Sequence, residues 1–270
     1  MKRIILLSGI CALCIQSILA QEKMFVHRSD KITQGVLLSV LDSMTFVNEA
    51  VLLHLHDQDA PTYSMTEIDS LSFGDNSLQI KILYSDTGIE IVNPLAFEGV
   101  SISVDDGNVI ITSTISEEVE YILTGTISNG MFKIYSDKKF ILTLNGVNIT
   151  NADGPASNIQ SGKKVTVNLT EGTINTLTDG KKYADSGSED MKGCFFSEGQ
   201  LIFNGEGALY VQGNKKHGIC SDDYLLVNSG NITITGAASD GIHANDYIRI
   251  DGGSVTVTSD SDGLDGDEGY

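Results

Sequence analysis

The sequence predicts an all-β fold, a parallel β-helix with about 23 residues per coil, preceded by a small N-terminal β module. Three observations predict it. Segments recur at that spacing, each contains short β-branched strands that alternate apolar with polar residues, and Gly, Asn and Asp separate the strands. Such short strands cannot bury a core alone. Stacking each strand on its copy one repeat later gives a continuous interior and satisfies the backbone.

Residues 1–20 have the pattern of a signal peptide. A basic start is followed by one apolar stretch, which ends at Ala20. A lipid anchor is the competing interpretation, but neither Cys11 nor Cys14 follows the small-residue pattern that lipid modification needs. No second apolar segment follows, so we expect no membrane span and a secreted chain, either periplasmic or at the cell surface.

Residues 21–76 form the predicted N-terminal module. The run 41–46 recurs at 68–73, and an alternating β-like stretch precedes each copy, so we expect a strand-rich unit that ends near Gly74. It is similar to the leaders that precede binding domains in secreted proteins of Bacteroidota.

Residues 77–270 form the predicted β-helix. The run 197–204 returns at 221–228 and again at 244–251, with more divergent copies at 140–149 and 165–174. A leucine-rich repeat would need its Leu and Asn signature, and a propeller blade would need about twice the length. The chain stops at Tyr270, where the next strand should begin and where an uncapped edge would be exposed. We therefore expect this sequence to be a truncated version of a longer protein.

The charge balance restricts the partners. The formal net charge is −19, which should repel phosphate backbones, so we expect no nucleic acid partner. An anionic polysaccharide would also be repelled unless a divalent cation bridges the two. Since the chain has no Trp, sugar rings could stack only on Tyr or Phe. We expect a monomer.

Acidic residues gather in the last turns and predict a Ca²⁺ site. The triplet 240–242 repeats at 262–264, which would place two aspartates about 5 Å apart on consecutive coils. A hard cation with about six to eight oxygen ligands would relieve their repulsion. Solvated turns that keep the chain soluble are the alternative. The predicted metal ligands are Asp222, Asp223, Asp240, Asn245, Asp246, Asp260, Asp262, Asp265, Asp267 and Glu268.

Three tyrosines follow the acidic turns at a constant spacing of 23: Tyr224, Tyr247 and Tyr270. They form either an aromatic ladder on the surface, suited to stacking against sugar rings, or an internal stack that fills a corner of the coil. The sequence leaves both interpretations open.

Four further side chains lie near these turns. Cys194 and Cys220 fall at neighbouring rather than stacked positions of consecutive coils, so we expect two buried thiols rather than a disulfide. His217 and His243 are expected to be ordinary turn histidines with satisfied hydrogen bonds, because neither has a visible Ser or Cys partner.

Several short motifs carry a family resemblance. They include the runs 144–149, 154–156, 171–175, 177–180, 192–193 and 217–219, and the closing Asp-Gly repeats. Over about residues 95–270 the chain resembles the secreted carbohydrate-binding-domain proteins whose fold is like that of pectate lyases. The resemblance implies a right-handed parallel β-helix, bound calcium and affinity for plant cell-wall polysaccharides, including acidic ones. It implies no catalytic residues.

The expected function is therefore non-catalytic, calcium-assisted binding of polysaccharide. A polysaccharide lyase is the alternative, in which calcium neutralises a uronate carboxylate and a Lys or Arg removes the neighbouring proton. A polygalacturonase would instead need a compact set of carboxylates. A second alternative is a surface adhesin or scaffold without sugar affinity. The lyase candidates are Arg249, Lys215 and Lys216, and the polygalacturonase candidates are Asp222, Asp223 and Asp246.

Overall fold

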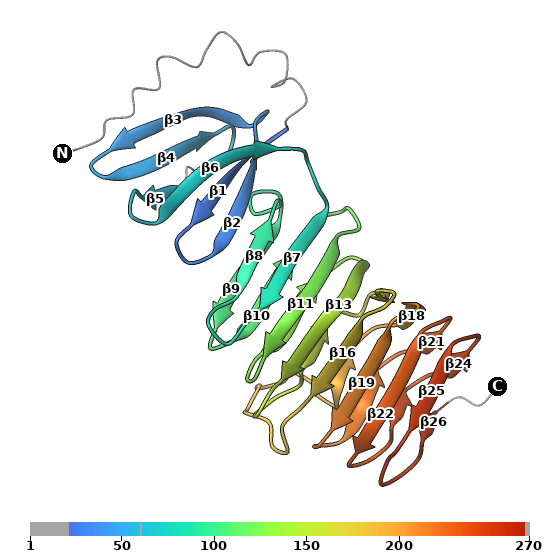
Figure 1. The fold of residues 1–270 in the computed structure, drawn as a ribbon. Helices are drawn as coiled ribbons and strands as arrows, with labels where there is room; N and C mark the ends of the chain where they lie inside the picture. Colours follow the sequence, from blue (N-terminus) through green and yellow to red (C-terminus); the bar gives the residue numbers. More distant parts are fainter. Residues whose placement is uncertain (1–21, 60, 268–270) are drawn as a thin grey trace.

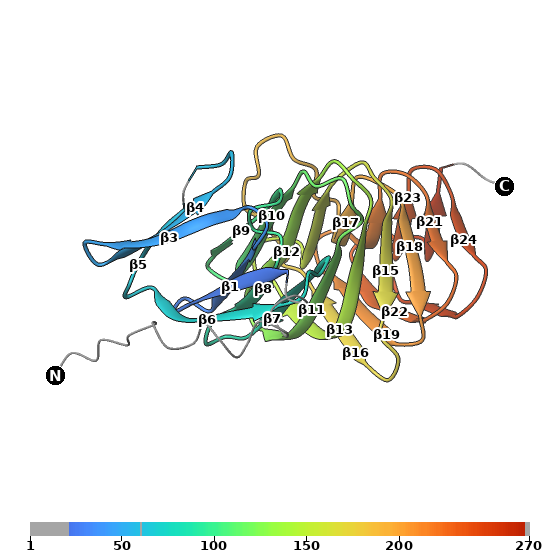
Figure 2. The same cartoon turned by 90° about the horizontal axis from the view of Figure 1, so that it is seen from above.

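The computed structural model describes residues 22–59 and 61–267, which contain strands β1 to β26 and no helix. The all-β prediction is thus confirmed for this part of the chain. The strands stack along one long axis, with β1–β6 at one end and β24–β26 at the other (Figures 1 and 2). The predicted signal peptide, Glu268 and Tyr270 lie outside the described residues. No helix that could span a membrane is found among the described residues.

The first six strands pack around their own apolar cluster, which includes Met24, Val26 and Leu53. β1 pairs antiparallel with β2 and β6, and β3, β4 and β5 form a separate antiparallel sheet. β2 also pairs in parallel with β8, so the sheet continues into the coils. The bounds are β1 (Lys23–Arg28), β2 (Ile32–Leu37), β3 (Leu41–Val47), β4 (Ala50–Leu55), β5 (Thr62–Ser64) and β6 (Ile68–Gly74).

Two antiparallel pairs open the coiled region, β7 with β8 and β9 with β10. Beyond them, every pairing between β10 and β26 in the described chain is parallel, apart from the pair with β9. The bounds are β7 (Gln79–Tyr84), β8 (Glu90–Asn93), β9 (Val100–Asp105), β10 (Asn108–Ser113), β11 (Glu120–Ile127), β12 (Met131–Ser136) and β13 (Phe140–Thr150).

Successive coils build three parallel ladders. The first ladder runs β7, β11, β13, β15, β18, β21, β24; the second runs from the ends of β11 and β13 to β16, β19, β22, β25; the third runs β10, β12, β14, β17, β20, β23, β26. The remaining bounds are β14 (Ser157–Gln160), β15 (Val165–Leu169), β16 (Ile174–Thr178), β17 (Gly193–Ser197), β18 (Leu201–Gly205), β19 (Ala208–Gly213), β20 (His217–Ser221), β21 (Leu225–Val227), β22 (Asn231–Ala237), β23 (Ile242–Ala244), β24 (Ile248–Ile250), β25 (Ser254–Val257) and β26 (Leu264–Gly266).

The repeat register read from the sequence is confirmed by the strand pairing. Leu201 pairs with Leu225 and Leu225 with Ile248 in the first ladder, as the copies at 197–204, 221–228 and 244–251 require. Alternation turns these apolar side chains inward, where they join one core that extends from Ile80 to Ala244. The polar residues between them face outward.

A column of glycines marks the bend from the first ladder to the second. At Gly205 the backbone has φ +92°, and a Cβ there would lie 2.1 Å from the carbonyl oxygen of Leu169 on the previous coil. Only glycine combines this left-handed backbone with so close an approach. Glycines with positive φ occupy the corresponding bend in six coils: Gly125, Gly146, Gly172, Gly205, Gly230 and Gly253.

Candidate functional site

The outward side chains of the third ladder form a continuous row. Paired positions place Lys133, Asn158, Phe196, Cys220, His243 and Asp265 on successive coils. An outward row would ordinarily be exposed, yet Asn158, Phe196 and Cys220 are fully buried. The segment between β16 and β17, which we call the 179–192 loop, contacts Lys133 through Glu189 and the Phe196 ring through Lys192.

The loop is fastened at three points. Glu189 accepts hydrogen bonds from Lys133 Nζ at 2.5 Å and from the hydroxyl of Tyr135. Lys192 Nζ lies 2.8 Å from both carboxylate oxygens of Asp222. At the loop's start, Asp179 accepts hydrogen bonds from Asn214 of the next coil, at Oδ1 from the backbone amide and at its carbonyl from Nδ2 at 2.7 Å. These contacts tie the loop to coils on both sides of its own position in the chain.

Beyond the loop the row continues into a cluster of metal-ligand residue types. The rings of His217 and His243 are stacked, with centroids 4.6 Å apart and an angle of 11° between planes. One donor atom from each of His217, Cys220 and His243 lies within 4.8 Å of the others, and the same holds for Asp240, His243 and Asp265. In the described part of the chain these are the two such groups of His, Cys, Asp or Glu.

The expectation of turn histidines with satisfied hydrogen bonds was wrong for His217 in both respects and for His243 in its position alone. His217 is the first residue of strand β20, and His243 is the middle residue of strand β23. The sulfur of Cys220 lies within 4.8 Å of a ring nitrogen of each histidine. His243 is bonded through Nδ1 to Asp265 Oδ2 at 2.8 Å and through Nε2 to Asn245 Oδ1 at 3.2 Å. Neither ring nitrogen of the buried His217 makes a hydrogen bond. The expectation of two buried free thiols, Cys194 and Cys220, is confirmed.

Burial keeps His217 and Cys220 in their neutral forms. Burial, reinforced by Lys216 and His243, lowers the pKa of His217 to about 4, so its ring is uncharged at pH 7. Burial also raises the pKa of the Cys220 thiol to about 12. Partial burial raises the pKa of Asp240, but hydrogen bonds from Ser261 and Asp262 lower it by more. The Asp240 carboxylate is therefore ionised beside the two histidine rings.

The other predicted metal ligands take different positions. Asp222 pairs with Lys192, and Asp223 accepts hydrogen bonds from Gln200 and from the Tyr224 amide. The Asp246 amide donates to the Asp223 carbonyl at 3.2 Å, so their turns lie on adjacent coils. The Asp262 amide donates to Asp240 Oδ1 at 3.1 Å, while the side chains of Asp260, Asp262 and Asp267 are exposed.

The two described tyrosines of the predicted series form a stack. The Tyr224 and Tyr247 rings are 5.1 Å apart at 12°, in the turns that join the third ladder to the first, and both are half-buried. Because each ring covers a face of the other, much of the solvent-accessible surface of the stack is its rim. Partial burial, Tyr247 and Asp223 raise the pKa of Tyr224, so its hydroxyl remains a hydrogen-bond donor at neutral pH.

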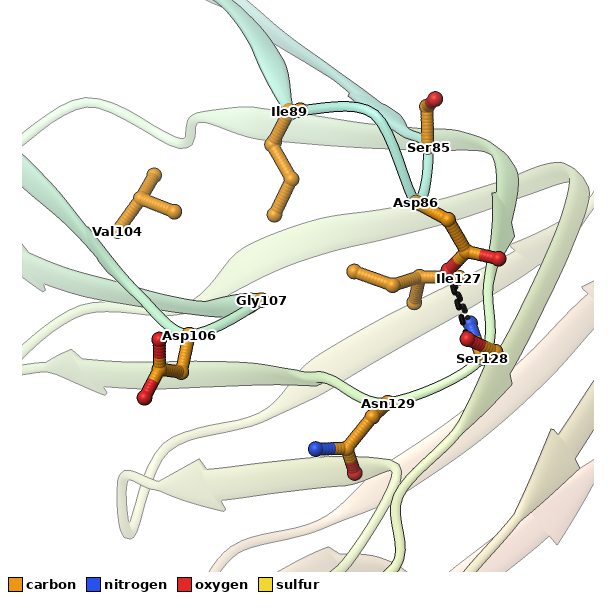
Figure 3. Close-up of a pocket in the computed structure, with 10 residues that line it drawn as sticks. Ser85, Asp86, Ile89, Val104, Asp106, Gly107, Ile127, Ser128 and Asn129 are labelled. Atoms are coloured by element: carbon orange, nitrogen blue, oxygen red, sulfur yellow. Dashed lines mark hydrogen bonds between the residues drawn. The ribbon is translucent and has the colours of Figure 1, made fainter.

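A cavity of about 440 Å³ lies at the opposite end of the coils (Figure 3). Three turns surround it, and Asp86 bridges two of them by accepting hydrogen bonds from Ser128 N at 2.7 Å and Ser128 Oγ at 2.9 Å. These bonds lower the pKa of Asp86. The sequence interpretation missed this site because its turns lie outside the regular repeats. The lining residues are Ser85, Asp86, Gly88, Ile89, Val104, Asp106, Gly107, Ile127, Ser128 and Asn129.

The candidate catalytic side chains are engaged in other contacts. Arg249 pairs with Asp251 at 2.7 Å, and Lys215 Nζ lies 4.2 Å from the centre of the Tyr183 ring. Asp222, one of three carboxylates considered for a polygalacturonase, is neutralised by Lys192.

Comparisons with known proteins agree with the coiled region. Residues 105–269 match the family model described as carbohydrate-binding domain-containing protein. A protein of that name from Acetivibrio thermocellus is 35% identical over 118 residues, 42% of this chain and 41% of the relative, so the chain spans well under half of that relative's length. The solved structure of the polysaccharide lyase-like protein from C. thermocellum, a gadolinium derivative, aligns with a TM-score of 0.59 at 26% identity, over 70% of this chain and 79% of that one. The family model covers more than half of the sequence, and this chain therefore belongs to the family of carbohydrate-binding domain-containing proteins.

Proposed function

We propose that this chain is a secreted, non-catalytic polysaccharide-binding protein. The observation that carries the proposal is the match of the carbohydrate-binding domain family to residues 105–269, which include the tyrosine stack and the acidic turns. Secretion is supported by the basic and apolar start of residues 1–20. Two of the three candidate basic residues of a lyase, Arg249 and Lys215, are held in an ion pair and a ring contact, which favours binding over catalysis.

We infer that the coils wind as a right-handed parallel β-helix. Nearly all connections between parallel strands of one sheet are right-handed, because a right-twisted strand packs back onto its sheet in that sense. The three parallel ladders and the likeness to the polysaccharide lyase-like structure support this inference.

The tyrosine stack is the proposed contact for the sugar. Its half-buried rings offer apolar surface to sugar C–H groups, and the hydroxyls can donate to ring oxygens. Asp223 lies directly before Tyr224, and Asn245 lies two residues before Tyr247, so hydrogen-bond acceptors flank the aromatic surface. Apolar surface with a few polar groups is the usual composition of a ligand site.

Calcium would act as a bridge in this proposal. The fit of the residues to Ca²⁺ is partial: Asp223 and Asp246 come from adjacent turns, but no third carboxylate among residues 22–59 and 61–267 forms a compact group with them. Backbone carbonyls and the carboxylates of an acidic sugar would supply the remaining oxygen ligands. Calcium would thereby reduce the repulsion between a uronate polymer and a chain of net charge −19.

The test is a binding assay with insoluble cellulose and with polygalacturonate, in calcium and in chelator. We expect the Tyr224→Ala and Tyr247→Ala variants to bind about 5- to 30-fold more weakly, because each removes one aromatic contact of roughly 1–2 kcal/mol. Tyr210→Ala is the control, since Tyr210 is an exposed tyrosine on the outward face of the second ladder, away from the stack. Chelation should weaken binding to polygalacturonate more than binding to cellulose.

Each contrary outcome has a meaning. Failure to bind any polysaccharide in either condition would favour the scaffold alternative. Equal affinities of the Tyr224 variant and the wild-type chain would move the site elsewhere, with the Asp86 cavity as the next candidate. Ultraviolet absorbance from unsaturated uronate would identify a lyase, since a binder produces none.

A further inference from the structure

His217 is a buried donor with no hydrogen-bond partner. Its side chain is 3% exposed, and neither ring nitrogen is hydrogen-bonded, although Nδ1 lies 3.1 Å from Asp240 Oδ2. A buried polar group without a partner costs roughly 1–3 kcal/mol, so such groups point to a missing ligand.

The neighbours of His217 are ligands of one chemical kind. Cys220 is fully buried on the outward row, and His243 lies on the next coil, stacked against the His217 ring. Space beside the cluster is kept by Gly193, which pairs with His217; a Cβ at Gly193 would lie 3.1 Å from the Cβ of Cys220.

We propose that His217, Cys220 and His243 bind a divalent transition-metal ion of the Zn²⁺ class, with Asp240 or Asp265 completing the site. Two imidazoles and a thiolate are nitrogen and sulfur ligands, which Zn²⁺ accepts and Ca²⁺ does not favour. The site is therefore distinct from the calcium bridge at Asp223 and Asp246, and it does not depend on polysaccharide binding.

The geometry is close to that of a zinc site. Zn²⁺ holds such ligands at about 2.0–2.3 Å, so donor atoms around it lie within roughly 4 Å of each other, and small torsional changes would bring the present set, within 4.8 Å, to that spacing. A carboxylate lies against a ring nitrogen of each histidine, 3.1 Å for Asp240 with His217 and 2.8 Å for Asp265 with His243. Both carboxylates are therefore within reach of an ion bound at these nitrogens, and either one can supply the fourth ligand.

Metal binding would replace the S–H bond of Cys220 by a sulfur–metal bond and release the proton to solvent. The high pKa of the buried thiol means that the proton stays on in the metal-free protein and leaves with metal entry. The neutral His217 ring needs no deprotonation.

Titration of the full chain with Co²⁺, in excess Ca²⁺ and after treatment with chelator, tests the proposal. We expect about one Co²⁺ per chain and a sulfur-to-cobalt charge-transfer band, which Zn²⁺ should abolish by displacement. Cys220→Ser should lose the band, and His243→Gln should weaken binding at least ~10-fold, since losing a ligand costs no less than losing its supporting partner. His56→Ala is the control, because His56 also lies near two carboxylates, those of Asp42 and Asp57, but in the N-terminal module.

A thermal measurement covers the case in which a variant folds poorly. Zn²⁺ should raise the Tm of the wild-type and His56→Ala chains but not that of His243→Gln, whose side chain is partly exposed, at 16%, and lies on the outward row. Absence of the charge-transfer band in wild-type protein, or wild-type cobalt affinity in both His243→Gln and Cys220→Ser, would overturn the assignment.

Discussion

Asn175 shows what one polar residue does inside the coils. It occupies an inward position of the second ladder, paired with Leu209, and is fully buried. Its Oδ1 accepts from the amides of Gly146 at 2.9 Å and Val147 at 3.0 Å, and its Nδ2 donates to the Ala208 carbonyl at 3.0 Å. One side chain thus satisfies the backbone of the coils before and after its own.

Asn175→Ala should destabilise the fold by about 2–3 kcal/mol, because it leaves buried backbone groups without partners. Urea denaturation measures the loss. Asn204→Ala is the comparison, since Asn204 lies on the outward face and bonds only Asn228, at 2.9 Å; its effect should be about 1 kcal/mol or less. Equal losses in the two variants would contradict this role for Asn175.

The sequence predicted the orientation of a side chain correctly where its position in the alternating strand alone decides whether it faces inward or outward. The inward Leu201 and Leu225 and the outward Arg249 follow from strict alternation. It failed at His217, whose ring is buried and stacks on the ring of His243 on the next coil. Spacing in one repeat does not reveal such a contact.

The 179–192 loop is the element that breaks the repeat. It lengthens one coil, which is why Ser157 pairs with Phe195 across 38 positions while later rungs of the third ladder are separated by about 23. Its irregular sequence predicted no structure, so the burial of Asn158 and Phe196 on an outward row could not be anticipated. Its last residue, Lys192, lies 5.9 Å from the centre of the Phe196 ring, and Phe196 pairs with Cys220 of the proposed metal site.

Protonation of Glu189 should release this loop. Partial burial opposes its charge, but hydrogen bonds from Lys133 and Tyr135 prevail and lower the pKa of Glu189. A carboxyl whose pKa is lower when folded stabilises the loop above its unfolded pKa of ~4.3, and the contribution is lost as pH falls through the folded value. Carbon-13 NMR of the Glu189 carboxyl would measure this pKa directly.

Glu189→Gln reproduces the uncharged state at pH 7. Hydrogen exchange of residues 180–192 should then be faster by several-fold, because the charge-assisted bond to Lys133 is lost. Glu206→Gln, in an exposed turn, should leave the exchange unchanged. Unaltered protection in the Glu189 variant would mean that the loop is held by its other two contacts.

At the scale of the whole molecule, the N-terminal module is bonded into the coils. Lys23 of β1 is fully buried, donating to the Pro94 carbonyl at 2.5 Å and pairing with Glu98. Together with the pairing of β2 with β8, this joins two apolar clusters that the sequence treats as separate units. The module's strands followed from the sequence, but this junction did not, because it depends on residues 71 and 75 positions apart.

Glu98→Gln should destabilise the protein by about 3 kcal/mol, because it leaves the buried ammonium of Lys23 without its counter-charge. The double variant Lys23→Met with Glu98→Gln should recover part of that loss in urea denaturation. Glu90→Gln is the control, since the Glu90 pair with Lys31 is exposed and is expected to contribute less than about 1 kcal/mol. No recovery in the double variant would exclude a buried-charge penalty.

The parallel ladders also fix the distance between surfaces at the two ends of the coiled region. Six steps separate β7 from β24 in the first ladder, and at about 4.8 Å per step they fix roughly 29 Å along the axis. The Asp86 cavity and the tyrosine stack lie near the two ends of that interval and no flexible linker intervenes in the described coils. If both surfaces bind sugar, a short oligosaccharide can occupy only one of them, whereas a long polysaccharide can occupy both at once. The longer polymer would then bind more tightly through avidity, and the number of coils would set the polymer length at which this begins.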